Sequence, residues 1–140
     1  MATFIGIGLA LAVGCFARVV GLDRERGFYA TVLMVVASYY GLFAAMGGTA
    51  RAVVLECVVI AGFVGVAVAG FRGSRWLLVA GLFAHGVQDS FHGRVIANAG
   101  VPAWWPQFCM AYDVTAAVWL AGLILRERGR GAESRGMTGA

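Results

Sequence analysis

Residues 52–71 read AVVLECVVIAGFVGVAVAGF, and this stretch decides the fold class of the chain. Only one of its side chains, Glu56, is charged. The hydrocarbon core of a bilayer requires a helix of about 20 predominantly apolar residues. The stretch therefore predicts a transmembrane helix. The acidic residue inside it is a candidate for function, because a charge within a membrane span is costly.

The rest of the chain has the same character. Of its 140 residues, 61% are hydrophobic and 13% are charged, whereas an average soluble domain carries about 25% charged residues. Five apolar runs are long enough to cross a bilayer, and they predict an all-α integral membrane bundle of five transmembrane helices. The runs cover residues 3–22, 28–47, 52–71, 76–96 and 105–125.

Short polar segments separate these runs. They occupy residues 23–27, 47–51, 72–75 and 98–102. The fourth run is the least apolar, because it contains His85, Gln88, Asp89 and His92. A re-entrant or interfacial segment is therefore the alternative to a full span over residues 76–96.

The arginines predict an orientation. In the five-span arrangement nine of them fall on one side of the membrane, and only Arg51 and Arg94 fall on the other. Cytoplasmic loops of membrane proteins carry an excess of basic residues. The pattern predicts an N-terminus outside and a cytoplasmic C-terminus. The nine are Arg18, Arg24, Arg26, Arg72, Arg75, Arg126, Arg128, Arg130 and Arg135.

The chain divides into two regions. Residues 1–126 form the predicted five-span bundle, and the glycine- and arginine-rich residues 127–140 are expected to be a disordered cytoplasmic tail. The net charge of +4 is interpreted as attraction to anionic lipid headgroups rather than to nucleic acid. We expect a multi-pass protein of the bacterial inner (plasma) membrane. Its expected partners are the lipid bilayer and, because five spans are few, further copies of itself or another membrane protein.

Small residues recur at every fourth position in three of the runs. In the run over residues 105–125, Asp113 occupies the first of these positions. Residues four apart share a face of a helix, and small residues allow helices to approach closely in membranes. These sets therefore predict the seams of the bundle. They are Gly6, Ala10 and Gly14; Cys57, Ala61, Gly65 and Ala69; and Asp113, Ala117 and Ala121.

The ionisable residues within the runs fall at a similar depth. At about 1.5 Å of rise per residue, four runs place polar groups in the outer half of the bilayer. The sequence therefore predicts a polar pocket there, with the tyrosines and one histidine nearer its mouth. The pocket residues are Glu56, His85, Asp89, Asp113, His92, Tyr39 and Tyr40.

His85 and Asp89 are the candidate metal ligands. They lie one helical turn apart, and Glu56 and Asp113 from neighbouring helices would complete a site for a divalent ion such as zinc, iron or manganese. His92 is about 10 Å from His85 along a straight helix, too far to share the ion. Alternatively, the His85–Asp89 pair carries protons or only holds helices together. The three cysteines are interpreted as small hydrophobic residues.

Several segments together resemble a set of small bacterial multi-span membrane proteins of unknown function. They are residues 23–29 (DRERGFY), Tyr39-Tyr40, residues 85–92 and residues 104–113. This resemblance covers most of the chain and implies no particular activity. The histidine and aspartate pattern is also distantly similar to the seven-span zinc hydrolases related to alkaline ceramidase. The chain has fewer spans, two histidines and no serine spaced as in that group, so no catalytic residue is carried over.

Three hypotheses about function follow. The first is a membrane protein with a polar pocket open to the outer face, which handles a proton, an ion or a small polar molecule. The second is an intramembrane metal-dependent enzyme. The third is a non-catalytic accessory subunit whose polar groups only hold its helices together.

Overall fold

The computed structural model describes residues 1–137, with side chains as far as residue 130, and these residues contain helices and no strand. This confirms the predicted all-α class. The elements are α1 (Ala2–Val20), the 3-10 turn η1 (Leu22–Arg24), α2 (Arg26–Gly47), α3 (Ala50–Arg72), α4 (Arg75–Asp89), α5 (His92–Val95) and α6 (Trp105–Met137).

Four of the helices, α1, α2, α3 and the Trp105–Arg130 part of α6, are long and apolar enough to cross a membrane. Large apolar side chains cover their outer surfaces. Phe4 is 79% exposed and Val58 is 66% exposed. Soluble monomers rarely expose continuous apolar surface on this scale. The chain is therefore a membrane protein, and these side chains face lipid.

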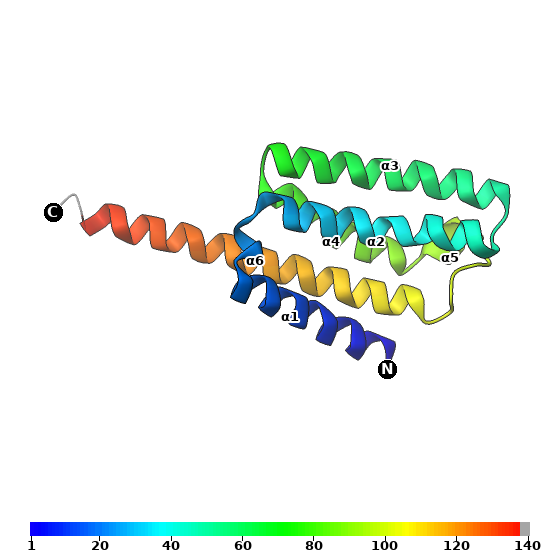
Figure 1. The fold of residues 1–140 in the computed structure, drawn as a ribbon, viewed down its shortest axis with the longest axis horizontal. Coiled ribbons are helices and arrows are strands. Elements are labelled where there is room, and N and C mark those ends of the chain that lie inside the picture. Colours follow the sequence, from blue (N-terminus) through cyan, green and yellow to red (C-terminus); the bar gives the residue numbers. More distant parts are fainter. Residues whose placement is uncertain (138–140) are drawn as a thin grey trace.

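The chain passes back and forth along one bundle, and its N-terminus lies at the opposite end from the described end of α6 (Figure 1). α6 lies between α1 on one side and α2 with α4 on the other. The main packing partner of α1 is α6, whereas α2 packs on α3, and α4 packs on both α3 and α6. α6 and α4 together therefore form the centre of the molecule.

The fourth passage differs from the predicted helix over residues 76–96. α4 has 15 residues and ends at Asp89, and the four-residue α5 begins only at His92. Fifteen residues of helix rise about 22 Å, less than the hydrocarbon core of about 30 Å. The prediction of one continuous helix is wrong at this end, because the break turns His92 towards Glu56 on α3. α4, α5 and the following loop still carry the chain from one end of the bundle to the other (Figure 1).

α6 continues beyond the bundle (Figure 1). Residues 127–137 are helical, which differs from the expected disordered tail over residues 127–140. The last three residues lie outside the described part. The extension is favourable because residues added to an existing helix do not have to nucleate a new one. Near its start, the guanidinium of Arg75 lies 2.8 Å from a carboxylate oxygen of Glu127.

The predicted seam on α1 is confirmed. Gly6, Ala10 and Gly14 are all buried, and they face α6. A Cβ added at Gly14 would lie 2.8 Å from the ring of Trp119. The small residues therefore allow α1 to lie directly against α6.

The predicted seam on α3 is wrong. Cys57, Ala61, Gly65 and Ala69 are all exposed. The buried residues of α3 are Ala52, Glu56, Ala67 and Gly70. The carboxylate of Glu56 has to face the bundle interior rather than lipid. Its neighbour Cys57 is rotated by about 100° around the helix, so the stripe that begins at Cys57 points away from the bundle.

Charged side chains gather at the end of the bundle where α1 ends. Asp23 is buried and accepts a 2.7 Å hydrogen bond from Arg18. The guanidinium of Arg128 lies 5.7 Å from the centre of the Trp76 ring. These pairs lie at the end of the bundle opposite to Glu56, which is near the start of α3.

Candidate functional site

All but one of the predicted pocket residues meet in the interior of the bundle. Each of these side chains belongs to a residue that is no more than 2% exposed. They are Tyr40, Glu56, His85, Asp89, His92 and Asp113. The exception is Tyr39, which is 37% exposed and packs on Trp105 with ring centres 4.9 Å apart. Neighbouring residues of a helix point about 100° apart, so only one of the two tyrosines can face inwards.

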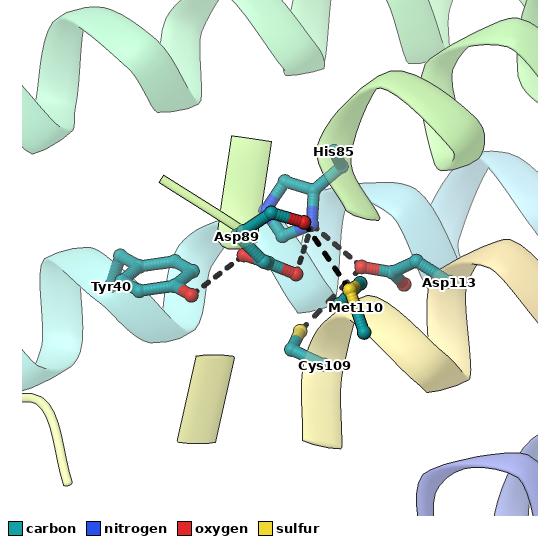
Figure 2. A network of polar contacts seen from close by, with 7 residues as sticks. Tyr40, His85, Asp89, Cys109, Met110 and Asp113 are labelled. Atoms are coloured by element: carbon teal, nitrogen blue, oxygen red, sulfur yellow. Dashed lines mark hydrogen bonds and ion pairs between the residues drawn. The ribbon is translucent and has the colours of Figure 1, made fainter. Parts of the chain in front are cut away.

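His85 on α4 contacts two carboxylates (Figure 2). Its Nδ1 lies 2.7 Å from Asp113 Oδ2 and 3.7 Å from Asp89 Oδ2. The nearest partner is therefore Asp113 on α6 rather than Asp89 one turn along α4. Asp89 is held from the other side, because the hydroxyl of Tyr40 donates a 2.6 Å hydrogen bond to its Oδ1.

Cys109 belongs to the same cluster, which the interpretation as a small hydrophobic residue missed. Its sulfur lies 3.5 Å from Asp113 Oδ2 (Figure 2). Cys109 and Asp113 are one turn apart on α6, as His85 and Asp89 are on α4. That repeated spacing is the sequence signal that could have identified Cys109. Glu56, which was expected to complete the site of His85 and Asp89, contacts His92 instead.

The four residues can supply ligands to one metal ion. The donor atoms of His85, Asp89, Cys109 and Asp113 lie within 4.8 Å of one another, and all four residues are buried. In a tetrahedral zinc site with bonds of 2.0–2.3 Å, ligand atoms lie about 3.3–3.8 Å apart. Small side-chain movements would therefore bring all four donors onto one ion.

A glycine brings the two helices close at this point. A Cβ added at Gly86 on α4 would lie 3.0 Å from the side chain of Val114 and 3.1 Å from the carbonyl oxygen of Met110. Both contacts are with α6. The small residue between His85 and Asp89 thus allows the donor pairs of α4 and α6 to face each other across a short distance.

Several carboxylate oxygens in this region are buried without a hydrogen-bond partner among the described residues. They are Asp89 Oδ2, Asp113 Oδ1 and Glu56 Oε2. Buried polar atoms are almost always paired in folded proteins. Around His85, two carboxylates face a single imidazole, so the acid groups outnumber the cationic ones. Unpaired oxygens in an acidic, enclosed cluster fit a bound cation.

A second buried pair lies beside the first. His92 Nε2 is 2.8 Å from Glu56 Oε1. Asn98 donates from Nδ2 to the same Glu56 oxygen at 2.9 Å and to the backbone carbonyl of Tyr40 at 3.1 Å. The rings of Tyr40 and His92 stack with centres 4.0 Å apart. The prediction that Glu56 completes the His85–Asp89 site is therefore wrong, because His92 and Asn98 hold it.

The cluster is enclosed, which differs from the expected pocket open to one face. Tyr39, the outlying residue, lines an apolar cavity of about 430 Å³ between α1, α2 and α6. Cys109 borders this cavity and also contacts Asp113. The cavity and the cluster thus share one side chain.

Comparison of the chain with protein-family models, with curated proteins and with solved structures gives no match. The function is accordingly argued from the geometry of the cluster.

Proposed function

We propose that the protein binds one divalent transition-metal ion, in the first place zinc, in the interior of its bundle. The proposed ligands are His85, Asp89, Cys109 and Asp113. The observation that carries the proposal is the pair of one-turn spacings on two facing helices, with all four donors within 4.8 Å of one another. Imidazole nitrogen, thiolate sulfur and carboxylate oxygen are the ligand types that zinc takes in proteins.

The charges of the cluster support a cation. With an ion bound, two carboxylates and a thiolate around a neutral imidazole would carry three negative charges, which a divalent ion reduces to one. Uncompensated charges buried away from water cost several kcal/mol each. Metal binding therefore accounts for an acidic cluster that lies within membrane-spanning helices.

The proposed topology is five crossings of the bacterial inner membrane, with the N-terminus outside and the C-terminus in the cytoplasm. Its support is the alternating course of the chain, with α4 and α5 as the fourth crossing. The positive-inside rule adds the direction, since nine of the eleven arginines belong to one side in this arrangement. The metal centre would then lie towards the outer half of the membrane.

A metal-dependent enzyme is the second candidate, and one observation favours it. Catalytic zinc sites keep one coordination position for water or substrate, whereas structural sites use four protein ligands. Cys109 is the one proposed ligand that borders the apolar cavity. Displacement of this ligand would open the ion towards that cavity and leave three protein ligands in place.

Metal analysis of the purified protein tests the proposal. We expect about one zinc ion per chain, lost in His85→Gln and Asp113→Asn. The control makes the same chemical change outside the centre: Asp23→Asn alters the buried aspartate near the end of α1. This control should retain the ion.

Two results would reject metal binding. One is protein without stoichiometric metal after dialysis against zinc, and the other is equal loss in the Asp113→Asn and Asp23→Asn variants. The cluster would then be interpreted as a network that handles protons or small ions, or as contacts that only hold an accessory subunit together. The extension of the network to Glu56 and His92 favours these two alternatives.

A further inference from the structure

The apolar cavity lies between three of the membrane-spanning helices. It lies where α1 and α2 diverge on either side of α6 (Figure 1). Its volume of about 430 Å³ falls within the range of about 300–1,000 Å³ that is usual for small-molecule sites. Most of its wall is apolar, from Leu9 on α1, Phe28, Val32 and Val36 on α2, and Phe108 on α6.

Two aromatic side chains with hydrogen-bonding groups meet at one end of this cavity. Trp105, the first residue of α6, lies against Tyr39 there, with ring centres 4.9 Å apart. Nε1 of Trp105 is buried without a hydrogen-bond partner among the described residues. The other polar side chains of the wall are those of Thr31, Cys109 and Tyr112. Tyrosine and tryptophan are enriched where membrane proteins meet the headgroup region, so this end is suited to the polar part of an amphipathic molecule.

The length of the cavity matches one leaflet of the bilayer. Along α2 its wall runs from Phe28 to Tyr39, a rise of about 16 Å at 1.5 Å per residue. Half of a hydrocarbon core of about 30 Å is about 15 Å. The cavity is therefore elongated parallel to the helices, over a length comparable to that of an acyl chain in one leaflet.

The volume of about 430 Å³ is spread over that length. Such an elongated apolar space suits a single extended hydrocarbon chain.

The metal centre lies beside the polar end. Cys109, which contacts Asp113, is one turn or about 6 Å along α6 from Trp105. We infer that the cavity binds one acyl chain of an amphipathic membrane lipid, with the polar linkage of the lipid next to Cys109. The inference rests on the proposed metal centre and names the class of molecule that reaches it.

A photoreactive lysophosphatidylglycerol with a diazirine in its acyl chain tests the inference on the purified, zinc-loaded protein. We expect crosslinks mainly on residues of the cavity wall, mapped by mass spectrometry. Thr31→Trp, which fills the cavity from α2, should reduce this labelling at least tenfold. The control is Val58→Trp on α3, where the side chain is 66% exposed and lies away from the cavity, and it should label as the native protein does.

Labelling spread evenly over the lipid-facing helices, or unchanged by Thr31→Trp, would overturn the inference. It also fails if Thr31→Cys forms disulfides between two copies and dimerisation excludes the probe, because the cavity would then be an interface. Zinc content is measured in the same samples. Specific labelling without zinc would reject the metal centre alone, whereas zinc without specific labelling would reject the lipid site alone.

Cobalt in place of zinc tests the link between cavity and centre. Addition of the unmodified lysolipid should shift the visible absorption of the cobalt-loaded protein and of Val58→Trp. It should leave the spectrum of Thr31→Trp unchanged. An unshifted spectrum in the native protein, with specific crosslinking retained, would show that the lipid does not reach the centre.

Discussion

Tyr40 supports Asp89 from outside the proposed ligand set. Its hydroxyl donates to Asp89 Oδ1 at 2.6 Å, which leaves Oδ2 as the oxygen nearer His85. The ring of Tyr40 stacks on His92. The second buried pair thus holds Tyr40 in place, and Tyr40 orients a ligand. Loss of a residue that supports a metal ligand in this way commonly lowers metal affinity by about 10–100-fold.

Tyr40→Phe should therefore lower both stability and metal affinity. The loss of a buried hydrogen bond leaves Asp89 Oδ1 unpaired, at a cost of about 1–3 kcal/mol, and the affinity for zinc should fall about 10–100-fold. Denaturant unfolding in detergent and competition with a zinc chelator measure the two effects. Tyr39→Phe is the control, since Tyr39 lies outside the cluster, and it should change neither. Equal effects in the two variants would contradict the role of Tyr40.

The individual residues of the site were only partly predictable. An acidic or histidine side chain in an apolar run must face the bundle interior, which is why Glu56, His85, Asp89 and Asp113 could be identified. Which of these side chains contact one another could not be predicted. It depends on the rotation of each helix and on the break after Asp89. Cys109 could not be identified by its polarity, because a free cysteine behaves as a small hydrophobic residue in an apolar run.

At the scale of the helix, Gly6 allows the backbone of α1 to approach the backbone of α6 directly. A Cβ added at Gly6 would clash with the backbone carbonyl oxygen of Phe108 and lie 3.2 Å from the Cβ of Ala111. A backbone atom cannot rotate away, so α1 would have to move. Gly8, two residues along, has no neighbour within 4 Å of such a Cβ.

Gly6→Ala should therefore destabilise the protein, and Gly8→Ala should not. Overpacking of this kind costs about 1–3 kcal/mol, whereas the change at Gly8 should be close to neutral or slightly stabilising because alanine favours helix. Denaturant titrations of both variants in the same detergent make the comparison. Equal stability of the two variants would show that α1 does not pack on α6 as described.

The length and position of the helices were easier to predict than their faces. The apolar runs located α1, α2, α3 and the membrane part of α6, because the lipid environment sets the length of a span. The seam on α3 was assigned to its small residues, although the position of Glu56 determines which face is buried. The end of α4 was missed because the contact of His92 with α3 is a tertiary interaction that no local pattern encodes.

At the scale of the whole molecule, the alternating passages predict which loops share a side of the membrane. The 47–49 turn and the 73–74 turn lie at opposite ends of α3. In the proposed orientation Thr49 is outside and Ser74 is cytoplasmic.

Cysteine labelling in intact cells tests this topology. With Cys15 and Cys57 replaced by serine, Thr49→Cys should react with a membrane-impermeant maleimide in intact spheroplasts. Ser74→Cys should react only after the membrane is permeabilised. Reaction of both positions in intact cells would contradict the proposed course of α3, and the reverse pattern would contradict its direction.

The central claim is that His85, Asp89, Cys109 and Asp113 hold one metal ion inside the bundle. X-ray absorption at the zinc edge tests it most directly, because it reports the atoms bound to the ion. We predict one sulfur at about 2.3 Å together with nitrogen and oxygen at about 2.0–2.2 Å. The sulfur should disappear in Cys109→Ser and remain in Cys57→Ser. A native spectrum without sulfur, or sulfur that survives in Cys109→Ser, would contradict the claim.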